Sequence, residues 1–376
     1  MNSFTFPNGR TIKNTLVMAP MTTYSSNKDE FFSEQELRYY ENRSKDVGML
    51  ITAALSVSVD GHGFFNHVSL DSDRNVARFG EFTASLKKEG AVIVAQLIHA
   101  GKLALPAEIG ENDVIAPSSI PTKRPGYAIP KEMTNEQAER IIHDFYEATK
   151  RAIKAGFDGV ELHGANGYLI QQFFSPYSNQ RKDQWGGTIQ NRLQFPLAVV
   201  QAVQKAVAEL KPDHFVVGYR LSPEETGQTG IALSDTKLLI DALIQRNIDY
   251  IHFSLDQFNQ KGIRPETKNA EIGRELIDFI DRRVPVIGVG KIKSLKDVVA
   301  AHSYGYDLVA IGRALLFQPR FGRAIVENKP ITFKYSPFVF LKNDLPRGLF
   351  QFLKQVILTQ LTEKLKNIWK RTEGNH

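Results

Sequence analysis

The chain has 376 residues and a formal net charge of +6, with 42% of its residues hydrophobic and 23% charged. This composition is typical of a globular protein and excludes a disordered or fibrous chain. The sequence contains no cysteine, which excludes disulfides, cysteine nucleophiles, thiolate zinc sites and cysteine-ligated iron–sulfur clusters.

The positive charge is concentrated near the C-terminus. Beyond position 332, eight Lys and Arg residues stand against three Asp and Glu residues, so this segment carries five of the six net charges. The rest of the chain is nearly neutral, which argues against a nucleic-acid partner. No apolar run reaches the roughly 18 residues of a transmembrane helix, and the N-terminus lacks the regions of a signal peptide. We therefore expect a cytoplasmic protein without an integral membrane segment.

Eight short apolar runs predict buried parallel strands, and amphipathic stretches between them predict helices. In chain order the strand runs are TLVMAP (15–20), GMLITAA (48–54), AVIVAQL (91–97), GVELH (159–163), FVVGYRL (215–221), YIHFS (250–254), VPVIGVG (284–290) and DLVAIG (307–312). The helical stretches are 33–46, 76–89, 134–155, 190–210, 233–246, 270–282 and 294–302. Eight alternations of strand and helix predict an α/β fold, a (β/α)₈ TIM barrel, with an open doubly wound sheet as the alternative.

Two segments depart from this alternation. Residues 103–131 contain five prolines and little periodicity, so they are expected to form a long loop that either covers the active site or is an inert excursion. The C-terminal segment carries an apolar helical stripe opposite basic residues, which predicts a basic amphipathic helix that docks on the barrel, pairs subunits or contacts an anionic surface. The stripe is Leu349, Phe352, Leu353, Val356, Ile357, Leu361, Leu365 and Ile368, opposite Lys354, Lys364, Lys366 and Lys370. The expected organisation is a catalytic barrel over 1–332 and a C-terminal helical extension over 333–376.

In a barrel of this kind the active site lies at the C-terminal ends of the strands. The fourth strand run ends at His163, and Asn166 and Tyr168 follow in a glycine-containing turn. His163 and Asn166 are placed to hydrogen-bond one oxygen and to stabilise negative charge on a carbonyl or nitro group. Tyr168 is placed to donate a proton. The alternative for His163 alone is a purely structural histidine.

Glycines follow the seventh and eighth strand runs and are adjoined by cations. Gly290 precedes Lys291, and Gly312 precedes Arg313. Backbone N–H groups at such glycines can approach a phosphate closely, and in barrel enzymes the loops after the last two strands frequently form a phosphate site. The pair of loops predicts a phosphate-bearing ligand.

Six motifs in register carry a resemblance to a known family. They are APMTTY, QLIHAGK, HGANGYLIQQF with SPYSNQRKDQWGGTIQNR, VGYRLS, GVGKI and AIGR. Over about residues 4–330 the chain resembles the old yellow enzyme family of FMN-dependent NAD(P)H oxidoreductases. The resemblance implies a TIM barrel that binds FMN and uses NADH or NADPH as electron donor.

The resemblance also implies roles for individual residues. Backbone groups of Pro20, Met21 and Thr22 would line the flavin, with the Thr22 hydroxyl at its C4 carbonyl. Ala54 would pack beside the flavin, Gln96 would bond its pyrimidine edge, and Arg220 would lie near N1 and the C2 carbonyl. The phosphate would be held by Gly290, Lys291, Gly312 and Arg313. Tyr24, His163 and Asn166 would bind substrate, and Tyr168 would be the proton donor.

Two positions depart from common family patterns. Ala53 stands where family members often have an acidic residue, so the hydrogen bonding there is expected to differ. Thr22 stands where one branch carries a flavin-tuning cysteine, which places this chain with the threonine branch. The paired His163 and Asn166, in place of two histidines, point the same way.

The expected function is an FMN-dependent NAD(P)H oxidoreductase that reduces electron-poor alkenes, such as enones or nitro compounds, by ping-pong hydride transfer through flavin N5. One alternative is an FMN-dependent NADH oxidase or diaphorase without a dedicated alkene. A different class is a metal-dependent barrel lyase or epimerase that uses His163, although no His, Asp and Glu set has metal-ligand spacing, so no metal site is expected. A third is a binding protein that uses its basic tail. The partner is expected to be a small-molecule substrate, and homo-oligomerisation is left open.

Overall fold

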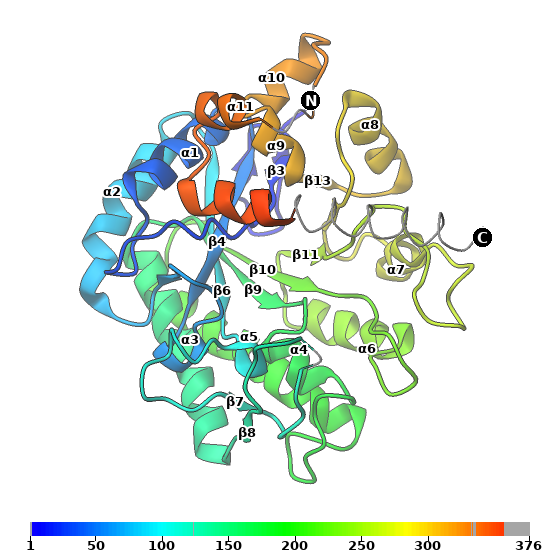
Figure 1. Ribbon diagram of the computed structural model, residues 1–376. Helices are drawn as coiled ribbons and strands as arrows, with labels where there is room; N and C mark the ends of the chain where they lie inside the picture. The colour runs from blue at the N-terminus through cyan, green and yellow to red at the C-terminus, as the bar shows by residue number, and fades with distance from the viewer. Residues whose placement is uncertain (1, 123, 332, 334–335, 357–376) are drawn as a thin grey trace, which may run out of the picture.

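The computed structural model describes residues 2–122, 124–331, 333 and 336–356. Eight parallel strands form a closed ring, because β13 pairs with β3 and β3 pairs with β4 (Figure 1). The ring consists of β3 (Leu16–Met18), β4 (Met49–Ser56), β6 (Val92–Ile98), β9 (Gly159–Gly164), β10 (Val216–Leu221), β11 (Tyr250–Phe253), β12 (Val286–Val289) and β13 (Leu308–Ile311). All eight predicted strands and the predicted barrel are confirmed, and the open sheet is excluded.

The seven predicted helices are present, with ends that differ by a few residues. They are α1 (Glu34–Ser44), α2 (Val76–Lys87), α3 (Asn135–Lys154), α5 (Ile189–Leu210), α6 (Leu233–Ile244), α7 (Ile272–Ile280) and α8 (Leu295–Tyr304). Side chains of Ser33 and Thr134 accept hydrogen bonds from backbone N–H groups in the first turns of α1 and α3 and form capping boxes with Glu36 and Gln137. These local signals explain why both helices begin where the sequence predicted.

Four short helices escaped prediction, because five or six residues are too few to show a helical period. They are α4 (Leu169–Phe174), α9 (Arg313–Phe317), α10 (Phe321–Val326) and α11 (Pro337–Lys342). Short strands and 3₁₀ turns are also present: β1 (Phe4–Thr5), β2 (Thr11–Ile12), β5 (Val68–Ser69), β7 (Ile115–Ala116), β8 (Lys131–Glu132), η1 (Val59–Gly61), η2 (Asp73–Asn75) and η3 (Gly101–Leu103).

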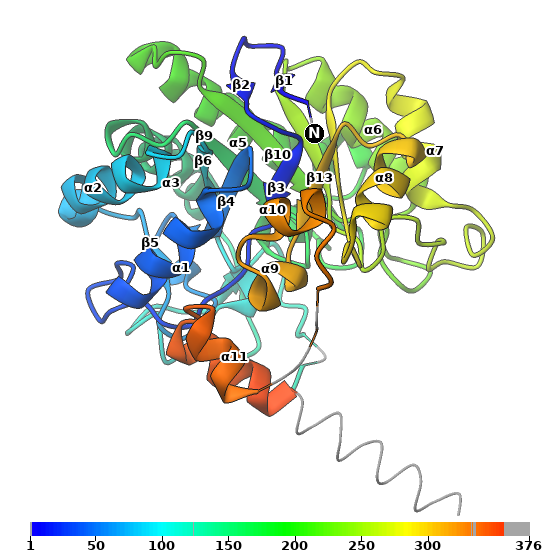
Figure 2. The ribbon, with the colours of Figure 1, turned by 90° about the horizontal axis from the view of Figure 1, so that it is seen from above.

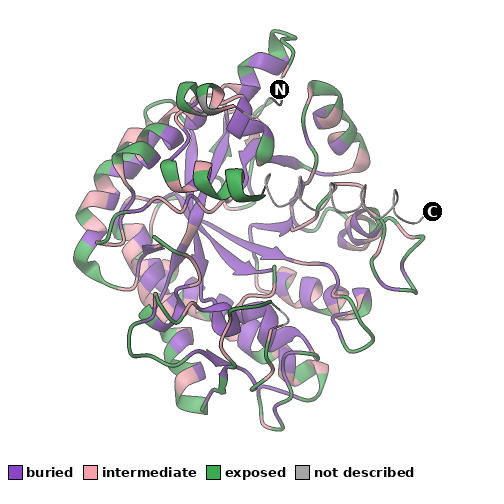
Figure 3. Cartoon of the chain, viewed as in Figure 1, coloured by how far each residue is buried: buried purple, intermediate pink, exposed green. Residues whose placement is uncertain are grey.

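Alternate side chains along each strand point to opposite faces of the barrel wall. Outward apolar residues such as Val160 and Leu162 join the large cluster beneath the helices, whose inner faces are buried (Figure 3). Inside the barrel, Phe6 and Ile12 of the N-terminal hairpin pack on the inward residues Val17, Met49 and Val92. The hairpin β1–β2 and helix α11 lie at opposite ends of the barrel (Figure 2). The hairpin therefore closes the amino end, and the carboxyl end is left for a ligand.

The described part of the C-terminal extension packs on the barrel. Leu345 and Leu349 are buried in the main core cluster. The buried Arg43 side chain of α1 donates to the backbone carbonyl oxygens of Asn343 and Leu315 at 3.0 and 3.2 Å. Residues 347–356 are helical, and the Gly348 N–H donates to Ser25 Oγ at 2.8 Å.

A Cβ at position 348 would lie 1.8 Å from the Tyr24 carbonyl oxygen, so this close approach requires glycine. Docking on the barrel, one of the expected roles of the tail, holds for these residues. The predicted stripe positions Ile357, Leu361, Leu365 and Ile368, and the basic positions Lys364, Lys366 and Lys370, lie outside the described residues. The boundary between 332 and 333 stays a prediction.

Among the residues that the structure describes, no helix combines the length and the apolarity needed to cross a lipid bilayer.

Candidate active site

Three inward-facing side chains from neighbouring strands form the centre of the site. Strand register places His163 of β9 beside Arg220 of β10, and Arg220 beside His252 of β11. All three side chains are buried, and His163 is 4% exposed. Burial, followed by the positive charge of Arg220, lowers the pKa of His163 to about 3. His163 is therefore a neutral imidazole at physiological pH, able to donate or accept a hydrogen bond.

Asn166 is held at the entrance of the site by two serines. Its backbone has a positive φ of 59°, a conformation that asparagine tolerates better than most residues. The Asn166 N–H donates to Ser222 Oγ at 2.9 Å, and Asn166 Oδ1 accepts from Ser254 Oγ at 2.8 Å. Ser254 Oγ in turn accepts from Arg220 Nη2 at 3.2 Å. Because the carbonyl side of the amide is occupied, the exposed Nδ2 group is the donor that a ligand can use.

Tyr168 completes the predicted trio. Its ring lies 4.9 Å from the His163 ring and 5.8 Å from the Phe64 ring, measured between centroids. Burial raises the pKa of the Tyr168 hydroxyl well above the ordinary phenol value. The hydroxyl is therefore protonated at physiological pH and can donate. The structure brings His163 and Tyr168 into contact and links Asn166 to the same group through Ser254 and Arg220.

A buried carboxylate balances the charge of Arg220. Glu161 is fully buried and accepts hydrogen bonds from Gln96 Nε2 at 2.7 Å, His252 Nδ1 at 2.8 Å and Tyr250 Oη at 3.1 Å. Burial alone would raise the pKa of Glu161, but contact with His252 and the charge of Arg220 keep it below the ordinary carboxyl value. Glu161 is thus an anion in a site that holds one buried cation.

Sequence reasoning missed the residues that support Arg220 and Asn166. Glu161 and His252 are polar residues inside the apolar runs GVELH and YIHFS, which is the signal that could have found them. Ser254 follows β11 directly, at the strand end where the predicted site lies. The positions alone could not show that these side chains meet across three strands.

The predicted phosphate residues come together at the ends of β12 and β13. A cavity of 160 Å³ is lined by Gly290, Lys291, Gly312 and Arg313, together with Leu255, Asp256, Val289, Ile292, Lys293 and Ala310. Gly290 has a φ of 117°, and a Cβ there would lie 2.6 Å from the Gln257 backbone. Lys291 Nζ donates to Gln257 Oε1 at 3.0 Å. The cavity thus combines glycine backbone with three cationic side chains, Lys293 being one that the sequence did not suggest.

The remaining predicted cofactor residues lie at the ends of β3, β4 and β6. Met21 Sδ lies 3.6 Å from the point where a Cβ of Gly312 would stand, which places the Pro20, Met21 and Thr22 segment beside the phosphate loops. Strand register pairs Ala54 with Gln96. The Ala53 N–H donates to Tyr40 Oη at 2.8 Å, so a tyrosine from α1 bonds the backbone beside Ala54.

A larger cavity of 550 Å³ opens above Tyr168. Aromatic side chains from five segments dominate its walls, and Arg124 is the charged residue in the lining. The aromatic residues are Tyr24, Phe64, Phe65, Tyr127, Tyr168 and Phe352. The Phe352 ring stacks on the Tyr24 ring with centroids 4.8 Å apart and an interplanar angle of 28°. The long loop supplies Leu103, Leu105, Arg124 and Tyr127, and the C-terminal helix supplies Gly348, Gln351, Phe352 and Gln355. Both segments therefore cover this cavity.

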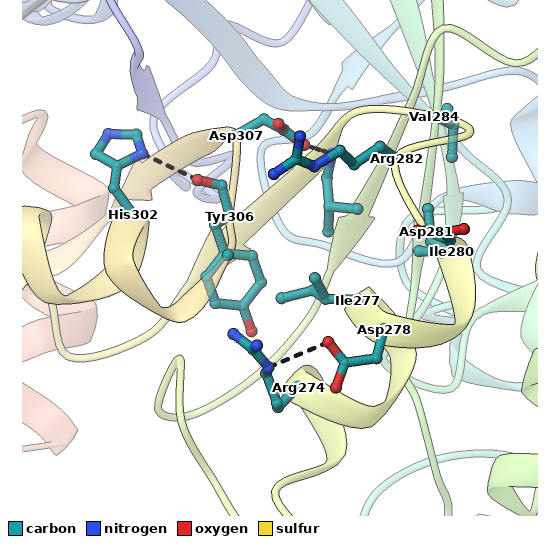
Figure 4. Close-up of a pocket in the computed structure, with 12 residues that line it drawn as sticks. Arg274, Ile277, Asp278, Ile280, Asp281, Arg282, Val284, His302, Tyr306 and Asp307 are labelled. Carbon is teal, nitrogen blue, oxygen red and sulfur yellow. Dashed lines mark hydrogen bonds and ion pairs between the residues drawn. The ribbon is translucent and has the colours of Figure 1, made fainter.

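A hollow of 430 Å³ lies between α7 and α8, at the amino ends of β12 and β13 (Figure 4). Arg274 Nε pairs with Asp278 Oδ1 at 3.1 Å, and Asp307 Oδ2 accepts from the Val286 N–H at 2.8 Å. His302 Nδ1 lies 2.9 Å from the Tyr306 carbonyl oxygen. These groups already have partners and lie away from the carboxyl ends of the strands, so this hollow is structural.

Comparison with known proteins places the site in context. The sequence model of the NADH:flavin oxidoreductase / NADH oxidase family matches residues 3–331. A protein named probable NADH-dependent flavin oxidoreductase YqiG, from Bacillus subtilis, is 44% identical over 331 residues, 87% of each chain. The NADH:fumarate oxidoreductase of Klebsiella pneumoniae is 37% identical over 88% of this chain, and the NADH:acrylate oxidoreductase of Vibrio harveyi is 36% identical over 98%. This chain spans 36% and 37% of the lengths of those two proteins.

Solved structures show the same fold. The old yellow enzyme homologue from Zymomonas mobilis superposes with a TM-score of 0.76 at 24% identity, covering 92% of this chain and 98% of that one. Morphinone reductase in complex with tetrahydroNAD gives a TM-score of 0.75 at 25% identity, covering 88% of this chain and 91% of that one.

Proposed function

Because this chain belongs to the NADH:flavin oxidoreductase / NADH oxidase family, we propose that it passes hydride from NADH, through FMN, to an electron-poor alkene. The chain is a flavin-dependent NAD(P)H oxidoreductase, with FMN as cofactor and NADH or NADPH as donor. The choice of NADH, the alkene acceptor and the residue roles are the proposal. The observation that carries it is the group formed by neutral His163, oriented Asn166 and protonated Tyr168, of which Tyr168 also lines an aromatic cavity.

The residues present fit FMN. Arg220 Nε is buried without a hydrogen-bond partner among the described residues, which is the donor that an electron-rich ring edge would satisfy. Gly290, Lys291, Gly312 and Arg313 would hold the phosphate, since glycine backbone and cations line one small cavity. Pro20, Met21, Thr22, Ala54 and Gln96 would contact the flavin ring. When bound, FMN supplies the centre that accepts hydride from the nicotinamide and returns it to the second substrate.

Charge balance explains the role proposed for Arg220. Its guanidinium is buried, and desolvation lowers its pKa, yet the Glu161 carboxylate favours the charged form. A fixed cation at this place would stabilise negative charge that develops on a neighbouring ring. Glu161, held by Gln96, His252 and Tyr250, keeps that cation in position.

His163 and Asn166 would donate hydrogen bonds to one oxygen of the acceptor and draw electron density from its alkene. Hydride would then add to the β-carbon, and the Tyr168 hydroxyl would give its proton to the α-carbon. The tyrosinate would recover a proton from water. Tyr24 would contact the acceptor from the cavity wall, since it lines the same space as Tyr168. The cavity that Tyr24 and Tyr168 share supports a ping-pong order in which nicotinamide and acceptor bind there in turn.

The names of the relatives support NADH as donor, because YqiG and the fumarate and acrylate oxidoreductases are all named for NADH. Fumarate and acrylate, the acceptors in the names of those two relatives, are weaker guides to the acceptor of this chain, since it spans little more than a third of their lengths. The walls of the 550 Å³ cavity carry six aromatic residues, which favour a planar conjugated acceptor over a small acid. Oxygen as acceptor, the activity of an NADH oxidase, is the competing function.

Anaerobic stopped-flow absorbance of the FMN-loaded enzyme separates these functions. NADH should bleach the flavin bands faster than NADPH, and an aromatic enone should restore them faster than air-saturated buffer or fumarate. Tyr168→Phe should reduce the rate of reoxidation by the enone by about 10²-fold while flavin reduction by NADH continues. Tyr146→Phe removes a phenol that donates to Glu209 in an exposed pair between α3 and α5, and it should match the wild type. Reoxidation by oxygen alone, with no acceleration by any enone, would refute the alkene reductase and leave the oxidase.

A further inference from the structure

Two histidines and a glutamate converge beside the substrate cavity, away from the residues assigned above. Ligand atoms of Glu30, His62 and His67 lie within 4.8 Å of one another. We propose that these three residues bind a divalent transition-metal cation such as Zn²⁺, which fastens the wall of the cavity. Sequence spacing gave no sign of this site, because Glu30 is distant in the chain and the two histidines do not have helical ligand spacing.

Three buried ring nitrogens in this cluster face carboxylates but form no hydrogen bond of good geometry with them. The His62 side chain is 1% exposed and the His67 side chain 9% exposed. Neither His62 Nε2 nor either nitrogen of His67 makes a hydrogen bond among the described residues. Buried polar atoms without hydrogen bonds are rare, and a bound metal ion is one group that satisfies them.

The tautomer of His62 is set by its surroundings. His62 Nδ1 lies 3.0 Å from the backbone carbonyl oxygen of Glu108. A carbonyl oxygen accepts, so Nδ1 must carry the hydrogen and Nε2 of the neutral ring must carry the lone pair. Metal-binding histidines commonly use one nitrogen as ligand while the other donates to a carbonyl oxygen. His62 thus has the arrangement of a metal ligand.

Carboxylates surround the rings. Asp71 Oδ2 lies 3.6 Å from His62 Nε2, Glu108 Oε2 lies 3.2 Å from His67 Nδ1, and Glu30 Oε1 lies 3.9 Å from His67 Nε2. Of these three acids, Glu30 also pairs with Arg74 Nη2 at 2.8 Å. Three carboxylates therefore stand against one guanidinium around the two rings, an excess of acidic groups that suits a divalent cation.

Protonating both histidines would also balance the charge, but the geometry opposes it. The two ring centroids are 3.5 Å apart with an interplanar angle of 32°. Two imidazolium rings at that separation would repel each other strongly in a buried site. A metal ion instead supplies the positive charge at one point, between the rings and the carboxylates, and leaves the rings uncharged. Imidazole nitrogen with carboxylate oxygen suits Zn²⁺ and similar ions better than Ca²⁺ or Mg²⁺, which prefer oxygen ligands alone.

The site has a structural consequence for the cavity. His62 and His67 flank residues 63–66, all of which line the cavity above Tyr168. Within that loop, the Phe64 ring contacts the Tyr24 ring at 6.2 Å and the Tyr168 ring at 5.8 Å. An ion that joins both ends of the loop to Glu30 would fix Phe64 against the two tyrosines. The ion would therefore hold the cavity wall in place, and it would take no part in hydride transfer.

Isothermal titration of tag-free, chelator-treated, FMN-loaded enzyme with ZnCl₂ tests the site. The wild type should bind about one Zn²⁺ per chain, and the His62→Gln/His67→Gln double variant should bind it at least about tenfold more weakly. Glu30→Gln should weaken binding in the same direction. His143→Gln is the matched control, since His143 lies exposed on α3 beside a glutamate, and it should bind as the wild type does.

The proposal would be overturned if the double variant bound Zn²⁺ as tightly as the wild type does, or if the wild type bound no Zn²⁺. If the double variant does not fold, anomalous diffraction at the zinc edge from crystals of unmodified enzyme decides the matter. A peak between His62 and His67 supports the site, and a peak elsewhere or none refutes it.

Discussion

Ser254 offers a direct test of how the acceptor-binding amide is positioned. Its hydroxyl donates to Asn166 Oδ1 at 2.8 Å and accepts from Arg220 Nη2 at 3.2 Å. Ser254→Ala removes both bonds and leaves the side chains of Asn166 and Arg220 themselves unchanged. Asn166 is exposed, so the lost orientation should cost near the middle of the range for a net hydrogen bond, about 1 kcal/mol. That value corresponds to a roughly fivefold slower reoxidation by an enone.

Stopped-flow reoxidation of the reduced enzyme measures this effect separately from binding of the donor. A double-mutant cycle with Asn166→Ala isolates the mechanism, because Ser254→Ala should cost little more once the amide is gone. Ser254→Thr keeps the hydroxyl and should restore most of the rate. Ser222→Ala is the control, since Ser222 Oγ accepts from the Asn166 backbone N–H and makes no hydrogen bond to its side-chain amide. Equal effects of Ser254→Ala in the presence and absence of the Asn166 amide would refute the positioning role.

Further predictions concern the pH profile, the roof of the cavity and the phosphate site. Burial and the charge of Arg220 lower the pKa of His163 to about 3. The rate of enone reduction should therefore show no change of slope with pH near the ordinary histidine pKa of about 6.5. A change of slope there that His163→Asn abolishes would contradict a neutral imidazole. As the pH falls below about 6.5, His163 takes up a proton in the unfolded chain but not in the folded chain. The free energy of unfolding should therefore decrease as the pH is lowered from about 6.5 to 3, and it should decrease less in His163→Asn. Phe352→Ala removes the ring stacked on Tyr24. The KM for aromatic enones should rise severalfold, which corresponds to a loss of about 1 kcal/mol of binding, while the rate of flavin reduction by NADH stays unchanged. Equal KM values for the variant and the wild type would show that the tail does not contact substrate. Lys291→Gln with Arg313→Gln should weaken FMN binding by at least about tenfold, as measured by fluorescence on titration of the apoprotein, while riboflavin binding changes little.

The sequence predicted the barrel and the strand-end residues because both depend on local patterns. Each strand is a short apolar run, and a polar residue at its carboxyl end must face the same rim of a closed parallel sheet. His163 and Gly290 were therefore predicted from their positions at strand ends, and the role of Arg220 came from the family resemblance. Helices α9, α10 and α11 were missed, since a turn or two has no measurable period. Contacts that join distant segments, such as Phe352 with Tyr24 or Glu30 with His67, leave no trace in spacing.

The buried charges show why some site residues could be inferred and their supports could not. A cation inside a barrel is costly unless an anion lies beside it, so Arg220 required a partner somewhere on the neighbouring strands. Glu161 fills that need, and Gln96, Tyr250 and His252 satisfy its oxygens. Three donors around a buried carboxylate are also what a purely structural core requires. What distinguishes this arrangement from an ordinary core is that Arg220 retains an unpartnered Nε among the described residues and donates to Ser254, which in turn bonds the exposed Asn166 amide.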